Sequence, residues 1–267
     1  MSEITALRGS VAETIGTPTV VTDVVTMVGR SLRLSRRNLE VLLVSLMLPV
    51  ILMLMFVYLF GGAIDTGAAY VSYVVPGVLV LCAGFGSATT AVSVSQDMTN
   101  GVMDRFRSLD VSGAAVVSGH VAASVVRNAA STVLVFVIAF AIGFRSDADI
   151  LGWLAAGGVL LMFILAISWL AALVGVIARS PEAANGFTFF LMFLPYASSA
   201  FVPIDTMPGW LQGFSRHQPV TPVIESVRGL LDGTPVGNSP TLALAWCTGI
   251  LVVSVALSVV AFRRRTA

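Results

Sequence analysis

Lysine is absent from this sequence, and arginine supplies all fifteen basic residues. The phosphate-binding P-loop needs a lysine directly after its last glycine, so these residues carry no ATP site of that kind. Schiff-base chemistry through a lysine amine is excluded for the same reason. Charge of either sign is scarce: 11% of residues are charged, whereas soluble domains carry about 25%. A water-soluble fold would lack the polar cover that it needs.

Histidine and cysteine are also rare, and this narrows the chemistry further. The two histidines, His120 and His217, are far apart, so the pattern of a histidine pair that binds zinc is missing. The two cysteines, Cys82 and Cys247, lie inside apolar segments and are expected to be buried thiols rather than a disulfide framework. We therefore expect no metal site, no catalytic residues and no cofactor in this chain.

Apolar residues are abundant instead: 57% of the chain is hydrophobic, and the mean hydropathy is +0.93. A membrane-spanning helix needs about 20 apolar residues. Six runs of that kind predict an all-α integral membrane protein with spans at about 41–60, 70–95, 119–144, 150–178, 183–202 and 241–262. Pro49 and Pro195 are expected to kink their helices, which membrane bundles tolerate.

The arginines predict the orientation of these spans. Eleven of them fall in segments assigned to the inside and three in segments assigned to the outside, which is the positive-inside pattern. Both termini are therefore predicted to be cytoplasmic. No cleaved signal peptide is expected, because no basic segment followed by a short apolar run opens the sequence.

Arg127 lies within the third predicted span, near its inner end. An intramembrane charge often marks a transport pathway. An arginine near a helix end also reaches the headgroups with its long side chain. Both interpretations stay open for Arg127.

Three segments between the spans carry further patterns. Residues 22–38 predict a basic amphipathic helix that lies in the membrane interface. Residues 97–110 predict a short cytoplasmic helix with Phe106 on its apolar face, either a docking surface or a ring dipping into lipid. Residues 203–240 are rich in proline and glycine and predict short helices on the outer side. Within them, Glu225 and Arg228 are spaced to form an ion pair.

Two stretches then resemble the permease subunits of ABC-2 type exporters, most closely the daunorubicin-resistance-like multidrug efflux permeases. The first is Asn-Gly-Val-Met-Asp-Arg-Phe-Arg-Ser-Leu at 100–109. The second is Val-Pro-Ile-Asp-Thr-Met-Pro-Gly-Trp-Leu at 202–211, followed by Gln-Pro-Val-Thr-Pro at 218–222 and Glu-Ser-Val-Arg-Gly at 225–229. The resemblance implies an ABC-2 or ABCG-like exporter fold with an elbow helix at 22–38, a coupling helix at 97–110 and outer re-entrant helices. It also implies a bacterial plasma membrane as the location.

The resemblance also implies roles for residues. The positions expected to couple to an ATPase are Asp97, Asn100, Gly101, Met103, Asp104, Arg105, Phe106, Arg107, Leu109 and Asp110. Many relatives have proline where this chain has Asp110, so the end of the coupling helix is expected to be less sharply broken. The residues expected in the extracellular gate or re-entrant helices are Pro203, Pro208, Trp210, Phe214, Glu225 and Arg228.

The working unit implied by the family contains two permeases and two separate ATPase subunits, and the ATPases hold ATP and Mg²⁺. The second permease is either a copy of this chain or a paralogue, and no nucleic acid is expected. The expected domains are a flexible N-terminus at 1–21, a permease domain at 22–262 and a basic tail at 263–267.

The predicted function is ATP-driven export of hydrophobic drugs or lipid-like compounds, hence antibiotic resistance, by a chain that is not itself an enzyme. Phe189, Phe193 and Tyr196 in the fifth span are the candidate substrate-binding residues, although the same rings also suit contact with lipid. Lipid, glycolipid or peptide cargo is an alternative, as is a structural membrane partner. A secondary transporter is disfavoured, because no acidic residue lies inside a predicted span.

Overall fold

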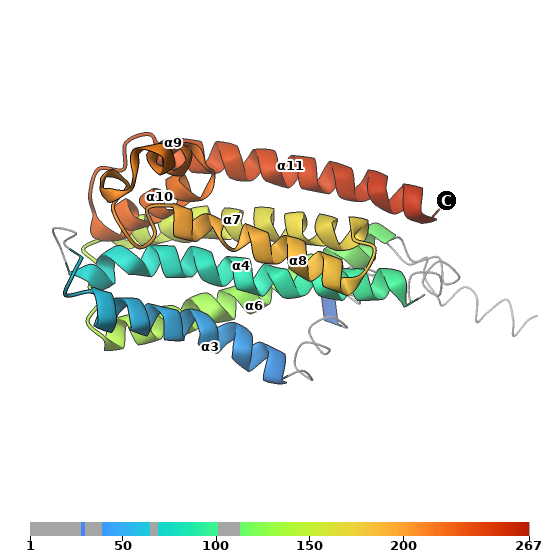
Figure 1. Ribbon diagram of the computed structural model, residues 1–267, viewed down its shortest axis with the longest axis horizontal. Coiled ribbons are helices and arrows are strands. Elements are labelled where there is room, and N and C mark those ends of the chain that lie inside the picture. The colour runs from blue at the N-terminus through green and yellow to red at the C-terminus, as the bar shows by residue number, and fades with distance from the viewer. Residues whose placement is uncertain (1–27, 30–38, 65–68, 101–112, 267) are drawn as a thin grey trace, which may run out of the picture.

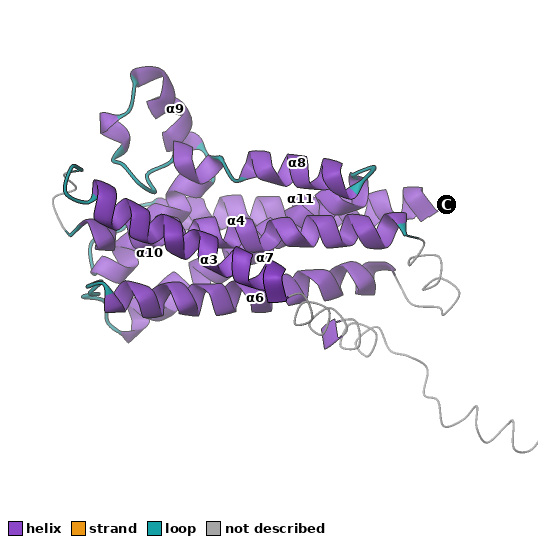
Figure 2. Cartoon of the chain, turned by 60° about the horizontal axis from the view of Figure 1, so that its bottom comes forward, coloured by secondary structure: helices purple, strands orange, loops and turns teal. Residues whose placement is uncertain are grey.

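The computed structural model describes residues 28–29, 39–64, 69–100 and 113–266, and the described part of the chain is helical, without a β-sheet (Figures 1 and 2). The predicted flexible N-terminus, nearly all of the elbow helix at 22–38 and the coupling segment from 101 onward lie outside the described residues. The last helix continues to Thr266 and so includes all but the last residue of the predicted basic tail at 263–267.

Long apolar helices occupy five of the six predicted ranges. They are α3 (Leu39–Met55) with its π-helical continuation η1 (Phe56–Phe60), α4 (Tyr70–Thr99), α6 (Gly113–Ala141), α7 (Ile150–Ile177) and α11 (Ser239–Thr266). Among the described residues, four helices are long and apolar enough to cross a membrane: α4, α6, α7 and α11. Apolar segments form helices here because a helix satisfies its own backbone hydrogen bonds in lipid, where water is absent.

The fifth predicted range, 183–202, is not one kinked helix as expected. Helix α8 (Pro181–Leu191) ends after 11 residues, and a separate 3₁₀ turn, η2 (Leu194–Ala197), follows. Pro195 explains where α8 ends, because its ring would clash with the carbonyl group four residues earlier, that of Leu191. The chain then turns instead of completing the span as a helix.

Helix α4 is the centre of the bundle and packs against α3, α6, α7, α8 and α10, while α7 lies between α4 and α11 (Figure 1). The first half of α4 is buried on all sides: every residue from Val74 to Ala83 is buried. Small residues set the closest approach. A Cβ atom added to Gly175 of α7 would lie 2.5 Å from the Ala91 carbonyl oxygen of α4. Helices associate in lipid by close packing of small residues, because lipid is as apolar as the helix surfaces and the hydrophobic effect therefore does not drive association.

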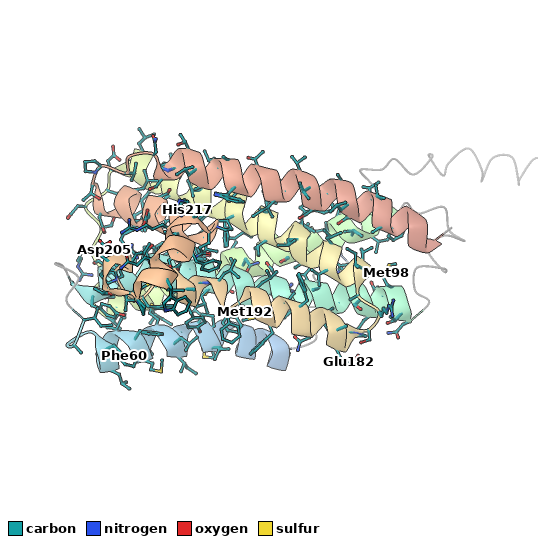
Figure 3. All side chains as sticks on the ribbon, turned by 45° about the horizontal axis from the view of Figure 1, so that its top comes forward. Phe60, Met98, Glu182, Met192, Asp205 and His217 are labelled. Carbon is teal, nitrogen blue, oxygen red and sulfur yellow. The ribbon has the colours of Figure 1, made fainter. Side chains whose placement is uncertain are left out.

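Short helices form a compact structure at one end of the bundle, on the left in Figure 1. We call residues 194–232 the cap; it contains η2, η3 (Ile204–Thr206), α9 (Gly209–His217) and α10 (Val220–Asp232). Asp205 and His217 lie at the cap end of the molecule, whereas Met98 and Glu182 lie toward the opposite end (Figure 3). Helices η3, α9 and α10 fall within the proline- and glycine-rich segment at 203–240 that predicted short helices, whereas η2 precedes it.

Candidate functional site

Arg228 of α10 fastens the cap to the central helix. Its guanidinium donates hydrogen bonds to the Tyr73 carbonyl oxygen through Nε (3.2 Å) and Nη2 (3.0 Å), and to the Ser199 carbonyl oxygen through Nη2 (2.6 Å). The guanidinium carbon also lies 3.8 Å from the centre of the Tyr73 ring, within the range of a cation–π interaction. One arginine therefore joins three segments: α10, α4 and the turn after η2.

Two further contacts hold the same turn against α4. The Tyr70 hydroxyl donates to the Phe201 carbonyl oxygen at 2.9 Å. Gly77 lies so close to Ala200 that an added Cβ would be 2.6 Å from the Ala200 Cβ. We call Tyr70, Tyr73, Gly77 and Arg228, with the turn at 198–201, the cap latch. Any movement of the cap away from α4 must break these contacts.

The predicted ion pair between Glu225 and Arg228 is not formed in the described structure. Ser239 instead lies within hydrogen-bond distance of Glu225, with its hydroxyl 3.3 Å from Oε2. Arg228 uses backbone carbonyl oxygens, which its planar set of donors can contact together. At the end of α10, burial raises the pKa of the Asp232 carboxyl, and the positive charge of Arg228 opposes that shift.

Two of the other predicted gate residues lie on helix α9, and two lie in the segment before it. Trp210 and Phe214 are exposed, at 80% and 52% of their surface. Pro208 precedes the first turn of α9, and the Pro203 carbonyl oxygen accepts a hydrogen bond from the Thr206 hydroxyl. These four residues therefore shape the cap rather than the latch.

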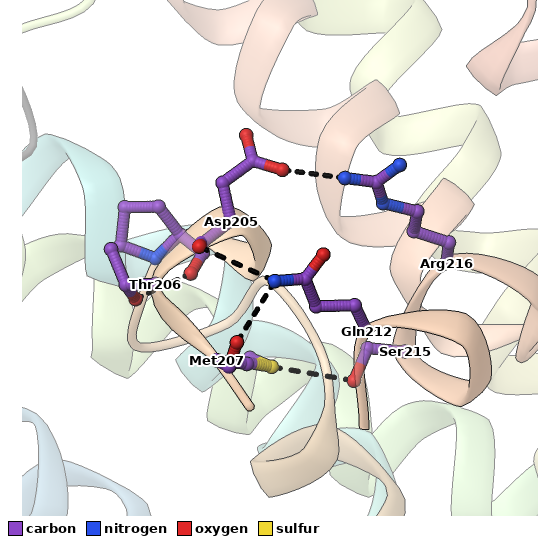
Figure 4. A network of polar contacts seen from close by, with 7 residues as sticks. Asp205, Thr206, Met207, Gln212, Ser215 and Arg216 are labelled. Carbon is purple, nitrogen blue, oxygen red and sulfur yellow. Dashed lines mark hydrogen bonds and ion pairs between the residues drawn. The ribbon is translucent and has the colours of Figure 1, made fainter. Parts of the chain in front are cut away.

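Polar contacts tie α9 to the loop before it, as Figure 4 shows. Arg216 forms an exposed ion pair with Asp205 at 2.5 Å, and the Gln212 side chain donates to the Met207 carbonyl oxygen at 2.9 Å. The Ser215 hydroxyl donates to the Met207 sulfur at 3.4 Å. The cap therefore has an internal polar network that joins α9 to η3 and the residue after it.

Arg127 lies in the middle of its helix, not near the inner end as the sequence suggested. The reason is that α6 begins at Gly113, six residues before the predicted span. Its Nη2 donates to the Gly86 carbonyl oxygen (3.2 Å) and to the Thr90 hydroxyl (3.0 Å) of α4. The side chain thus bonds to the neighbouring helix.

A buried polar cluster lies next to Arg127. Ser87, Ser124, Asn128 and Ser168 are each at most 2% exposed and connect α4, α6 and α7 through hydroxyl and amide hydrogen bonds of 2.9–3.5 Å. These four residues were not among the predicted site residues, because single serines in apolar runs are common. In lipid such groups stabilise helix contacts because leaving them unpaired is costly.

At the end opposite the cap, Asp97 and His120 form a polar contact between α4 and α6. Asp97 Oδ2 lies 3.0 Å from His120 Nε2, and the histidine is buried. Asn100 ends α4, and its backbone N–H donates to the Gln96 carbonyl oxygen. The remaining predicted coupling residues, from Gly101 to Asp110, lie outside the described residues.

The three predicted substrate-binding rings form a continuous row along α8 and η2. Phe189 contacts Phe193 (centroids 5.2 Å apart), Phe193 contacts Tyr196 (6.3 Å), and Tyr196 stacks on Phe201 of the turn in the latch (5.4 Å). Phe189, Phe193 and Tyr196 are 59%, 55% and 39% exposed and point away from the bundle. Among the described residues, no cluster of histidine, cysteine or carboxylate side chains could hold a metal ion.

Comparison with known proteins agrees with this architecture. The family model described as "ABC-2 type transporter" matches residues 22–231. The chain is 32% identical over 223 residues to the daunorubicin resistance ABC transporter permease protein DrrB1 of Streptomyces coeruleorubidus, covering 83% of this chain and 79% of that protein. It is 24% identical over 222 residues to the probable doxorubicin resistance ABC transporter permease protein DrrC of Mycobacterium tuberculosis, covering 82% and 80%. The chain therefore belongs to the ABC-2 type transporter family, as a permease subunit.

Proposed function

We propose that this permease exports hydrophobic drugs, with energy from a separate ATPase subunit. The observation that carries the proposal is similarity along four fifths of the chain to permeases whose names refer to daunorubicin and doxorubicin resistance. The bundle is compatible with it: apolar helices surround a buried polar cluster, and a latched cap lies at one end. In this proposal the cap forms the outer gate, and the polar contact of Asp97 with His120 steadies the inner end.

Six crossings with both termini in the cytoplasm are part of the proposal. The crossings are α3 with η1, α4, α6, α7, α8 with η2, and α11. Two exposed residues in the described structure test the orientation: Asp147, between α6 and α7, and Arg179, between α7 and α8. With Cys82 and Cys247 replaced, cysteine at position 147 should react with a membrane-impermeant maleimide in intact cells. Cysteine at position 179 should react only after the membrane is opened, and the reverse pattern would refute this orientation.

The proposed assembly contains two permeases and two ATPases. The segment at 97–110 would be the coupling helix, with Phe106 inserted into a groove of the ATPase, and the segment at 22–38 would lie in the membrane interface. ATP binding in the partner would shift the bundle between inward- and outward-open states. Moving such an equilibrium from 1:99 to 99:1 requires about 5.5 kcal/mol, a shift that differential binding of the ATPase in the two states must supply.

The aromatic row of Phe189, Phe193 and Tyr196 is the proposed contact surface for a flat apolar drug. Its exposure supports this, because a drug entering from the membrane could reach rings that face outward. A lipid or peptide cargo is the second candidate.

The test is transport by the purified permease reconstituted with the ATPase subunit that co-purifies with it. Proteoliposomes with the ATPase outside should take up daunorubicin when given ATP and Mg²⁺, and a non-hydrolysable ATP analogue should give no uptake. Parallel vesicles that contain a fluorescent phospholipid test the lipid alternative. ATP-dependent movement of the lipid but not of daunorubicin would replace the drug assignment, and movement of neither would refute export of both.

A further inference from the structure

A cavity of about 70 Å³ lies inside the bundle, between α4, α7 and α8. Its wall on α4 includes Gly84, Ser87 and Ala88, and its wall on α8 includes Thr188 and Leu191. The residues between α8 and η2 close it from one side, and Ile250 of α11 contributes from another. All of these lining residues belong to one chain, and the cavity is open on one side.

The lining is suited to apolar groups only. Its two hydroxyls are already engaged: Thr188 donates to the carbonyl oxygens of Ala184 (2.9 Å) and Asn185 (3.0 Å), and Ser87 is hydrogen-bonded with Ser168 (3.2 Å). A cavity lined in this way stays free of water, because a buried water needs two to four polar partners. A charged or strongly polar ligand would lose its hydration without replacement.

Helix α8 separates this cavity from the aromatic row. Phe189 and Phe193 lie on its exposed side, whereas Thr188 and Leu191 lie on the side that lines the cavity. Met192, labelled in Figure 3, stands where α8 ends and also lines the cavity. Because the α8 helix stops at Leu191 instead of continuing, regular helix packing against α4 also stops there. The cavity is therefore a second site, distinct from the surface proposed for cargo.

We propose that this cavity binds an uncharged apolar group, either a lipid acyl chain or an apolar ring. Apolar side chains line the cavity, and a hydrocarbon group would make van der Waals contacts with them. Gly84, Ala88, Leu191 and Met192 are half-buried, so the cavity is accessible from one side. The inference does not depend on the proposed transport function.

A pair of glycine substitutions tests the site. A Cβ added to Gly84 would lie 3.9 Å from Met192 Cγ, which is an ordinary contact, so a leucine side chain at this position extends into the cavity. Gly249 of α11 is exposed, with nothing within 4 Å of an added Cβ. Gly84→Leu and Gly249→Leu make the same chemical change inside a helix, and only the first fills the cavity.

The full-length permease in liposomes is labelled with two light-activated probes and mapped by mass spectrometry. One probe is phosphatidylcholine with a diazirine in its acyl chain, and the other is 3-trifluoromethyl-3-phenyldiazirine, an uncharged ring. We expect one or both to label Ala88, Thr188 and Met192. Gly84→Leu should lower this labelling by about fivefold or more, since the cavity is filled, while Gly249→Leu should leave it unchanged. Labelling by only one probe identifies the chain or the ring as the occupant.

A second variant covers the possibility that Gly84→Leu disturbs folding. Met192→Ala enlarges the cavity, and labelling of Thr188 should then rise by about twofold, because more space is open to the probe. Failure of both probes to label the lining in the wild type would overturn the proposal. So would labelling that a folded Gly84→Leu protein retains in full, or labelling that Met192→Ala does not raise.

Discussion

Removal of the Arg228 guanidinium should loosen the cap more than any other single change on its surface. Arg228→Met keeps most of the length of the side chain but deletes all three hydrogen bonds to the Tyr73 and Ser199 carbonyl oxygens. It also removes the cation–π contact with the Tyr73 ring. The Tyr73 carbonyl oxygen belongs to α4 and the Ser199 carbonyl oxygen to the turn held against it, and both contacts are partly buried, so little water can replace the lost donors.

The magnitude follows from the number and kind of contacts. A hydrogen bond to a charged group contributes about 1.5–3 kcal/mol, and a cation–π contact about 0.5–2 kcal/mol. Removal of a desolvated charge offsets part of this loss. A net loss of roughly 2–4 kcal/mol is therefore expected, and at about 2–4 °C per kcal/mol for a chain of this size the melting temperature should fall by about 5–15 °C.

Arg216 provides the matched control, because it is an arginine of the same cap in an exposed ion pair. The side chains of Arg216 and Asp205 are 54% and 84% exposed. Such pairs contribute about 0–1 kcal/mol, so Arg216→Met should shift melting by less than about 4 °C. Intrinsic fluorescence during heating of the detergent-solubilised protein measures both variants at one scan rate. If Arg228→Met melts within about 2 °C of Arg216→Met, a shift below what one kcal/mol produces, the latch does not hold the cap.

Three other changes test separate parts of the reasoning. Gly77→Ala places a Cβ 2.6 Å from that of Ala200 and should lose about 1–3 kcal/mol of stability by overpacking. The control Gly84→Ala makes an ordinary contact and should melt like the wild type, so equal melting of the two variants would contradict the close approach at Gly77. Phe106→Ala should weaken co-purification of the ATPase by about 2 kcal/mol or more while the permease still inserts; normal association would make the segment a connector. Phe193→Ala should lower daunorubicin-stimulated ATPase activity and leave basal activity intact, and an unchanged response to several hydrophobic drugs would remove the aromatic row from cargo binding.

The positions of the long helices could be read from the sequence because hydropathy acts locally. About twenty apolar residues in a row must form a helix in lipid, whatever lies around them. The ranges of α4, α7 and α11 followed from this rule to within a few residues. The start of α6 did not follow: the helix includes residues 113–118, which the predicted span left out, and Arg127 therefore lies in the middle of the helix.

The break after α8 was only half predicted. Pro195 signalled a disturbance, but a proline in a membrane helix either kinks it or ends it, and neighbouring groups decide which. Pro49 and Pro76 lie inside continuous helices, whereas Leu191 is the last residue of α8. After the break the chain enters the cap, whose contacts with α4 hold it in place, so the helix does not need to resume.

Four features of the sequence were enough to identify this protein as an ABC-2 permease. They are its scarcity of charge, its arginine distribution, its apolar runs and two stretches that resemble the family. The tertiary structure alone decided which residues meet. Arg228 contacts Tyr73 across 155 positions of the chain, and Tyr70 contacts Phe201 across 131. Contacts over such distances depend on how whole helices pack, and packing depends on the shapes of surfaces that no local pattern encodes. The cap latch, the buried polar cluster and the cavity beside α8 all depend on such packing.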